Sequence, residues 1–476
     1  MAHIVGRIEE KTLLNNLYNS GKAEFVALYG RRRVGKTFLV REYFKNEFAF
    51  YHTGLSPFEM EEKQLLEQQL RSFSYSLSRY GADIYETPKD WMEAFNVLIT
   101  LLENKLHSNP QKRMVVFIDE MPWMDTPRSG FVTALDHFWN GWGAGQENMM
   151  LIICGSSTSW INDNIINSTG GLYGRLTRSI HLAPMTLSEI EELQKRMGVI
   201  FDRYDIIQSY MIFGGIPYYH NGLQKGLSLA QNIDNLLFKD KAIFKNEFDR
   251  LFSSLFINPD EYKNIVRFLA NRREGYTREE IKTVASSTGG GLSKVLKRLI
   301  ECDFITQCRD FSGKEKNAKY KLTDPFCLFY LNFLEKKKTT NQHFWTSNLN
   351  KPILNSWSGF AFENICFLHI SQIKKALGIL GVQTEVSSWH SADNQIDMVI
   401  SRDDRILNLC EIKFCISSYT ITKEYDKKLK ERLQDFITLE HPKRAVHQTF
   451  ITTYGLTSNE YSQRIQSVVT LEDLFK

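Results

Sequence analysis

The sequence lacks the features that mark membrane, secreted and disulfide-rich proteins. No stretch approaches the roughly 18 apolar residues of a membrane span, and Met1 to Glu10 has no apolar signal core. The seven cysteines are odd in number and scattered, with no CxxC pair for zinc or for a disulfide framework. We therefore expect a soluble, cytoplasmic protein with no membrane partner, whose cysteines are reduced core residues.

Internal repeats, low-complexity segments and a strong net charge are also absent. The hydrophobic fraction of 42% and the charged fraction of 24% are those of ordinary soluble globular proteins. A net charge of +4 on so large a chain does not by itself indicate a nucleic-acid partner. Since a single core rarely grows beyond about 250 residues, a chain of 476 residues predicts about three domains.

The clearest motif is GRRRVGKT, which matches the phosphate-binding pattern G-x-x-x-x-G-K-[ST] between an apolar run and a helical pattern. Its glycines let main-chain N–H groups close around phosphate oxygens, and the following helix presents its positive end to them. Lys36 would neutralise the β and γ phosphates, and the Thr37 hydroxyl would ligate Mg²⁺. The motif predicts ATP and Mg²⁺ as cofactors, held by Gly30, Arg31, Arg32, Arg33, Val34, Gly35, Lys36 and Thr37.

A second apolar run, Met114 to Ile118, ends in two carboxylates. Asp119 is predicted to hold the magnesium through water, and Glu120 to polarise the attacking water. A third run, Met149 to Cys154, leads into Ser156 and Ser157, either of which could sense the γ-phosphate. The plain alternatives are an acidic loop and a turn.

Two arginines follow in LYGRLTR, which spans Leu172 to Arg178. Arg175 or Arg178 could place a guanidinium on the transferred phosphate, either in its own chain or from a second subunit of a homo-oligomer. A surface arginine pair is the alternative.

The apolar runs separated by helical patterns predict a parallel sheet covered on both faces in residues 1–185. Residues 186–257 are expected to form a helical lid from two helices, Leu187 to Tyr204 and Ile206 to Phe238. In residues 258–335, three helical patterns precede two strand-like pieces, which is typical of a winged helix-turn-helix.

Basic residues cluster on the two parts of this winged helix that would meet DNA. They are Lys294, Lys297 and Arg298 on the third helix and Lys314, Lys316 and Lys319 on the hairpin. The pattern favours DNA as a partner, while a protein-contacting spacer is the alternative.

Six motifs in this order resemble the prokaryotic AAA+/STAND ATPases, an archaeal-type ATPase family whose chains carry a winged helix and a C-terminal PD-(D/E)xK nuclease-like domain. They are VGRIEE, YGRRRVGKT, FIDE, CGSS, LYGRLTR and FGGIPYY. The resemblance implies an α/β fold: a P-loop NTPase parallel-sheet core with a helical lid, a winged helix-turn-helix and, over residues 349–476, an α/β restriction-endonuclease-like domain. It also implies that Pro217, in the Gly215-Ile216-Pro217 element, packs against the nucleotide base. No obvious arginine sensor occurs there, which leaves both a fast motor and a slow switch open.

The last segment carries a constellation of its own: Asp397 in QIDMVI, and Glu411 and Lys413 in CEIKF. Residues two apart in a strand share a face, so Glu411 and Lys413 point together. A three-residue loop centred on Asp404 would set Asp397 opposite Glu411, whereas a two-residue loop would set it opposite Cys410.

This constellation resembles the PD-(D/E)xK nuclease signature. Asp397 and Glu411 would hold one or two Mg²⁺, Glu363 on the preceding helix would bind metal through water, and Lys413 would orient the attacking water. An amphipathic hairpin with a Glu-Lys pair is the alternative. The whole sequence thus predicts a DNA-directed ATPase that gates a nuclease, with a non-cutting ATP-dependent switch that recruits a protein partner as the rival.

Overall fold

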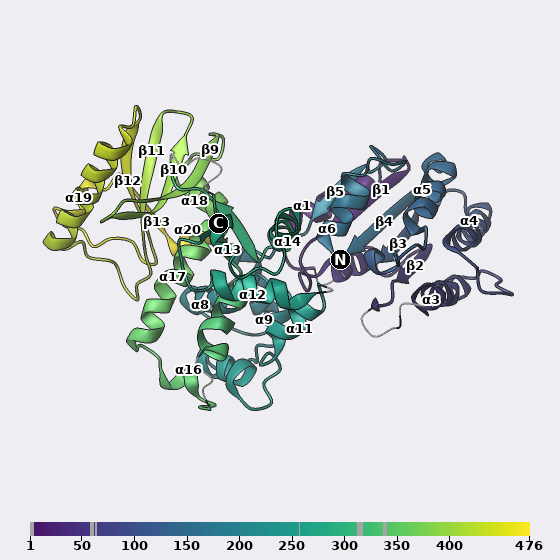
Figure 1. Ribbon diagram of the computed structural model, residues 1–476, viewed down its shortest axis with the longest axis horizontal. Coiled ribbons are helices and arrows are strands. Elements are labelled where there is room, and N and C mark those ends of the chain that lie inside the picture. Colours follow the sequence, from purple (N-terminus) through teal and green to yellow (C-terminus); the bar gives the residue numbers. More distant parts are fainter. Residues whose placement is uncertain (1–3, 58–60, 62–63, 257, 312–317, 337–339) are drawn as a thin grey trace. The chain divides into compact units, whose positions relative to one another are not determined.

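The computed structural model describes residues 4–476 except 58–60, 62–63, 257, 312–317 and 337–339 (Figure 1). The chain divides into two compact units, Met1–Pro184 and Met185–Lys476. The end of the first unit falls one residue before the predicted end of the ATPase core. The finer division of the second unit into residues 186–257, 258–335 and 349–476 stays a prediction.

A five-stranded sheet forms the centre of the first unit. Its strands are β1 (Glu24–Tyr29), β2 (Phe50–Thr53), β3 (Met114–Asp119), β4 (Met149–Gly155) and β5 (Arg178–His181). They lie in the order β2-β3-β4-β1-β5, and neighbouring strands pair in parallel. Because parallel strands end at the same edge, the residues that follow β1, β3 and β4 meet there.

Both faces of this sheet are buried, as predicted. One face packs in a single core with helices α3 (Leu65–Arg79), α4 (Trp91–Ser108) and α5 (Phe131–Gly141). On the other face, alternate residues such as Val26 and Ile152 are fully buried as well. The remaining helices of this unit are α1 (Ile8–Tyr18), α2 (Lys36–Tyr43) and α6 (Thr158–Ile161).

The second unit begins with short helices rather than the two long ones expected. They are α7 (Leu187–Arg196), α8 (Arg203–Phe213), α9 (Pro217–His220) and α10 (Leu229–Ile233). The first predicted helix is broken where Gly198 adopts a φ of 75° and Asp202 caps α8 by accepting from the Asp205 amide. The second is broken by Gly214, whose φ is 62°.

Gly215 makes a close backbone approach that only glycine permits. A Cβ at this position would lie 2.0 Å from the Met185 carbonyl oxygen. The backbone of Met185 cannot easily move away, because its N–H donates to the Gly215 carbonyl oxygen at 2.7 Å. We expect Gly215→Ala to destabilise the second unit by about 1–3 kcal/mol, the usual cost of overpacking.

Gly359 is the matched control for this substitution, because it lies in a helix and an added Cβ meets nothing within 4 Å. Gly359→Ala should stabilise the protein by up to about 1 kcal/mol. Thermal unfolding of both variants tests the contrast, and equal melting temperatures would contradict it.

Next come helices α11 (Glu247–Ser253), α12 (Pro259–Leu269), α13 (Arg278–Ile281) and α14 (Gly290–Glu301). A small antiparallel sheet accompanies them in the order β6-β8-β7, built from β6 (Tyr276–Thr277), β7 (Ile305–Cys308) and β8 (Lys319–Leu322). Two strands of this sheet were predicted, while β6 is a two-residue strand too short to produce a sequence pattern.

The remaining part holds a mixed five-stranded sheet in the order β13-β12-β11-β10-β9. Its strands are β9 (Thr384–His390), β10 (Gln395–Arg402), β11 (Ile406–Lys413), β12 (Ala445–Thr452) and β13 (Ser467–Thr470). The first three pair antiparallel, and the last three pair parallel. The sequence predicted the β10–β11 hairpin of this sheet.

Helices α15 (Pro325–Phe329), α16 (Phe344–Ser347), α17 (Pro352–Leu368) and α18 (Ile370–Ala376) precede this sheet. Helix α19 (Lys423–Glu440) connects β11 to β12, and α20 (Leu471–Leu474) ends the chain. All seven cysteines are free, as expected, and five are buried.

Candidate functional site

The predicted phosphate loop connects β1 to α2 at the carboxyl edge of the first sheet. Gly30 has a φ of 139°, and a Cβ there would lie 2.5 Å from the Leu182 carbonyl oxygen. Gly35 has a φ of 96° and is the N-cap residue of α2. Both glycines therefore occupy backbone conformations that other residues rarely adopt. The loop continues directly into the N-terminus of α2, where main-chain N–H groups can bind an anion.

Lys36 folds back over this loop. Its ammonium donates to the carbonyl oxygens of Gly30, at 2.8 Å, and Arg31, at 3.0 Å. The side chain is buried, so its charge sits in the loop that a triphosphate would occupy. Among the intervening residues, Arg31 and Val34 are buried and Arg32 and Arg33 are half-buried.

The Thr37 hydroxyl donates to the Asp119 carboxylate at 2.7 Å. These residues lie 82 positions apart, and the sheet brings them together because α2 and β3 both meet its carboxyl edge. A hydroxyl and a carboxylate side by side are the oxygen ligands that Mg²⁺ takes next to bound phosphates. The donor set therefore fits the predicted magnesium.

Glu120 follows Asp119 and has a φ of 46°, which is rare for a non-glycine residue. Its carboxylate accepts hydrogen bonds from the Ser156 amide, at 3.1 Å, and the Ser156 hydroxyl, at 2.9 Å. Burial raises the pKa of Glu120 above its usual value, although the nearby Lys36 ammonium opposes the shift. Of the two candidate serines, Ser156 is thus the one that contacts the predicted catalytic carboxylate.

Arg7 is a residue of this site that we did not predict. Its guanidinium donates to the Ala183 carbonyl at 2.8 Å and to the Val34 carbonyl, inside the phosphate loop, at 3.3 Å. The side chain is 5% exposed. The motif VGRIEE contains it, but nothing in the local sequence shows that its partner is a loop 27 residues away.

The two candidate arginines lie elsewhere on this unit. Both Arg175 and Arg178 are exposed. Arg178 pairs with Val26 in a parallel register in which Tyr29 pairs with His181. Three residues at about 3.3 Å each therefore place it about 10 Å back from the edge that carries the phosphate loop. Pro217, the predicted base contact, lies in the second unit as the first residue of α9, and its role stays a prediction.

The hairpin register in the second unit meets the geometric condition set by the sequence. Met398 pairs with Cys410 and Ser401 with Leu407, so the turn is centred on Asp404. Continuing this register sets Asp397 opposite Glu411. A bulge between Ile396 and Val399 on the β9 side lies at the same point, and the Asp397 carboxylate accepts from the Ile412 amide at 2.9 Å.

Glu411 is held by cations. The Lys413 ammonium lies 2.5 Å from one carboxylate oxygen and the Arg432 guanidinium 2.7 Å from the other, and the Tyr425 hydroxyl also donates to it. Burial acts to raise the pKa of Glu411, but Lys413 and Arg432 hold it below its usual value. Arg432 and Tyr425 both come from α19, which the sequence interpretation did not include.

The pKa of Asp397 shifts in the opposite direction from that of Glu411. Burial and then the nearby Glu411 and Glu363 carboxylates raise the pKa of Asp397 to about 7. Glu363 itself forms an ion pair with Lys321 of β8 at 3.3 Å. Over the described parts of the chain, no three acidic, histidine or cysteine side chains are grouped so that they could hold a metal, so the structure does not bring Glu363, Asp397 and Glu411 together as one ligand set.

Some of the basic residues predicted to contact DNA form ion pairs or hydrogen bonds with other residues of the chain. On α14, Lys297 pairs with Glu301 at 3.7 Å and Arg298 donates to the Tyr262 hydroxyl at 3.2 Å. On β8, Lys319 pairs with Asp310 at 2.8 Å. Lys294 is exposed, while Lys314 and Lys316 lie outside the described residues.

The chain is similar to several known proteins. The chain is 25% identical over 419 residues to an uncharacterized protein of Methanocaldococcus jannaschii, covering 86% of this chain and 87% of that protein. An uncharacterized ATP-binding protein of the same organism is 46% identical over 43 residues, or 9% of this chain and 73% of that protein. Among solved structures, the Walker-type ATPase of Pyrococcus abyssi has 18% identity and a TM-score of 0.47, covering 69% of this chain and 96% of its own.

In the described residues, no helix is long and apolar enough to cross a membrane.

The profile of an ATPase domain found predominantly in Archaea matches residues 5–221, the stretch that contains the phosphate loop, the Thr37–Asp119 pair and Glu120. The match and the geometry support ATP binding and hydrolysis. Residues 5–221 of this chain are therefore similar to the ATPase domain of this predominantly archaeal family.

Proposed function

We propose that the chain is a DNA-directed ATPase whose nucleotide state controls a metal-dependent nuclease site in the second unit. The main observation in support of the nuclease site is the β10–β11 register, which sets Asp397 opposite Glu411. Lys413 lies two residues further along the same strand, with its ammonium 2.5 Å from Glu411.

In the ATPase domain, Thr37 and Asp119 would hold Mg²⁺ beside the phosphates, where the cation neutralises charge on the phosphate oxygens. Lys36 would exchange its two loop carbonyl partners for phosphate oxygens. Glu120, whose pKa is raised by burial, would activate the attacking water. Ser156 positions Glu120 through two hydrogen bonds.

Arg175 and Arg178 fit a role in a neighbouring subunit better than in their own. They are exposed, and the parallel register holds Arg178 back from the phosphate-loop edge of its own sheet. A homo-oligomer in which one subunit's arginine reaches the phosphates of the next is therefore part of the proposal.

DNA would be bound by residues 258–335 as a winged helix. Three helices, α12, α13 and α14, together with the antiparallel β6-β8-β7 sheet support this proposal. The buried face of α14 comprises Leu292, Val295, Leu296 and Leu299, which leaves Lys294 and Lys297 on its exposed side. Such lysines contribute salt-dependent affinity without choosing a sequence.

At the proposed nuclease site, Asp397 and Glu411 are the residues that would hold Mg²⁺, and Lys413 would orient water or offset charge on the phosphate. Two carboxylates beside a lysine are a donor set that fits this metal. Burial, and then the nearby Glu411 and Glu363 carboxylates, raise the pKa of Asp397, and a cation at this position would offset the repulsion between the carboxylates.

A second candidate is a non-cutting, ATP-dependent switch that recruits a protein partner and uses the C-terminal fold for binding only. The ion pair between Glu363 and Lys321 favours this candidate. In a nuclease, the Glu363 carboxylate would instead bind the metal through water. The neutralisation of Glu411 by Lys413 and Arg432 favours it as well.

Incubating the purified chain with linear, circular and single-stranded DNA separates the two candidates. Each DNA is tested with Mg²⁺ or Mn²⁺, in the presence and absence of ATP. Metal-dependent cutting that changes with ATP is the expected result, whereas intact DNA under every nucleotide and metal condition contradicts the nuclease and leaves the switch.

A further inference from the structure

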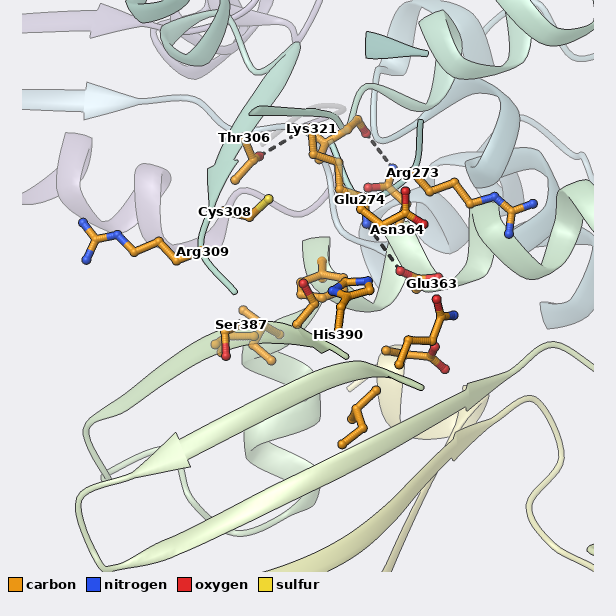
Figure 2. A pocket seen from close by; sticks show the side chains of 18 of the residues that line it. Arg273, Glu274, Thr306, Cys308, Arg309, Lys321, Glu363, Asn364, Ser387 and His390 are labelled. Atoms are coloured by element: carbon orange, nitrogen blue, oxygen red, sulfur yellow. Dashed lines mark hydrogen bonds and ion pairs between the residues drawn. The ribbon is translucent and has the colours of Figure 1, made fainter. Parts of the chain in front are cut away.

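A cavity of about 380 Å³ lies within the second unit, beside the proposed nuclease residues. Its lining includes Thr306 and Lys321 of the small sheet, Glu363 and Phe367 of α17, and His390 and Asp397 of the larger sheet. Figure 2 shows Thr306, Cys308 and Lys321 on one side of the cavity and Ser387 and His390 on the other, with Glu363 and Asn364 beside them.

The walls of this cavity are fastened to each other by specific bonds. The Phe311 amide donates to the Ser388 carbonyl at 2.7 Å, which attaches the chain after β7 to β9. The Asn364 side-chain amide donates to the Thr323 carbonyl at 2.6 Å, which attaches the end of β8 to α17. Hydrogen bonds thus hold together the small sheet, α17 and β9, which surround the cavity.

Next to the cavity, the Asp310 carboxylate contacts one residue of the small sheet and His390, which lines the cavity. Asp310 lies 2.8 Å from the Lys319 ammonium and 3.4 Å from His390. The hydrogen bond with His390, and then Lys319, lower the pKa of Asp310 to about 2. The contacts of Asp310 with Lys319 and His390 thus link the small sheet to β9.

The lining combines three kinds of chemistry. Four carboxylates and three cations line the cavity. Glu363 and Asp397 belong to the proposed metal site, the other carboxylates are Glu274 and Glu385, and the cations are Arg273, Arg309 and Lys321. The aromatic rings of Phe360 and Phe367 supply apolar surface, and a cation lies over one face of each ring: the Arg273 guanidinium over Phe360, and the Lys321 ammonium 5.2 Å from the Phe367 ring centre. A nucleotide matches this set, since its phosphate suits the cations and a metal and its base suits an aromatic face.

We propose that this cavity binds one unpaired nucleotide of a single strand, so that the substrate of the proposed nuclease is single-stranded or frayed nucleic acid. The inference rests on the proposed function for the identity of the acidic residues. A 380 Å³ space has the size of a small-molecule pocket, and a base can enter such a pocket only when it is out of the duplex stack.

Binding tests this inference without requiring cleavage. Fluorescent 12-mers of single-stranded DNA and single-stranded RNA, and a blunt duplex annealed from two separate strands, are titrated with the full chain in EDTA and followed by anisotropy. Thr306→Trp fills the cavity from an exposed strand position, and Phe367→Ala removes an aromatic wall. Leu380→Trp, at a side chain that is 56% exposed and outside the cavity lining, is the control.

We expect the wild type and Leu380→Trp to bind a single strand more tightly than the blunt duplex. Thr306→Trp and Phe367→Ala should each weaken single-strand binding about tenfold, as the loss of one stacked base does, and leave duplex binding unchanged. The DNA and RNA arms show which strand is preferred.

Equal binding of single strand and duplex by the wild type, or an unchanged preference in both cavity variants, overturns the inference. A thermal melt of each variant shows that a loss of binding is not a loss of fold. Selective single-strand binding without any metal-dependent cutting supports the cavity and contradicts only the nuclease proposal.

Discussion

Glu120→Gln is expected to bind ATP about as tightly as the wild type and to hydrolyse it at least about 100-fold more slowly, the usual contribution of a positioned base. Glutamine keeps the shape of the side chain and one oxygen acceptor for Ser156, which donates to Glu120 twice. It cannot take a proton from water. The loss should therefore fall on the chemical step and leave binding intact.

Single-turnover hydrolysis of radiolabelled ATP, together with equilibrium binding, separates these two effects. Glu86→Gln is the matched control, because Glu86 is an exposed carboxylate of the same unit. Equal turnover in the wild type and Glu120→Gln would remove Glu120 from the mechanism. Loss of ATP binding in Glu120→Gln would make its role structural.

Lys413→Met and Asp397→Asn should each lower DNA cutting by about 100-fold or more, as removal of one group that stabilises a transition state does. Lys413 supplies the cation nearest to Glu411, at 2.5 Å, and Asp397 supplies one of the two carboxylates. ATP hydrolysis should be unchanged, because both residues lie in the second unit.

The cleavage assay of linear and single-stranded DNA in Mn²⁺ measures this loss. Lys427→Met is the control, because Lys427 on α19 is 79% exposed and pairs only across one helical turn with Glu431. Thermal melts of both variants check the fold, since Lys413 neutralises a buried carboxylate. Cutting that persists in Lys413→Met and Asp397→Asn would contradict the assignment.

Short-range patterns predicted the parts of this molecule that short-range physics determines. The phosphate loop requires two glycines, a lysine and a threonine in eight consecutive residues, and the structure places Thr37 beside Asp119. The hairpin turn likewise depends on nearby residues, and its register about Asp404 follows the odd-loop alternative.

Elements that depend on tertiary contacts were missed. Strand β5 has only Ile180 buried, so its sequence shows no apolar pattern. Arg7 acts on a loop 27 residues away, and Lys321 pairs with Glu363 across 42 residues. These pairings come from packing between elements, which single-sequence periodicity does not contain.

Equilibrium binding of radiolabelled ATP to folded wild type and to Lys36→Ala tests the central claim most directly. Lys36 is the cation of the phosphate loop, and its ammonium lies 2.8 Å from the Gly30 carbonyl. We predict saturable binding by the wild type that falls to undetectable levels in Lys36→Ala. Folded wild-type protein that binds no ATP, or a variant that binds it undiminished, would contradict the account.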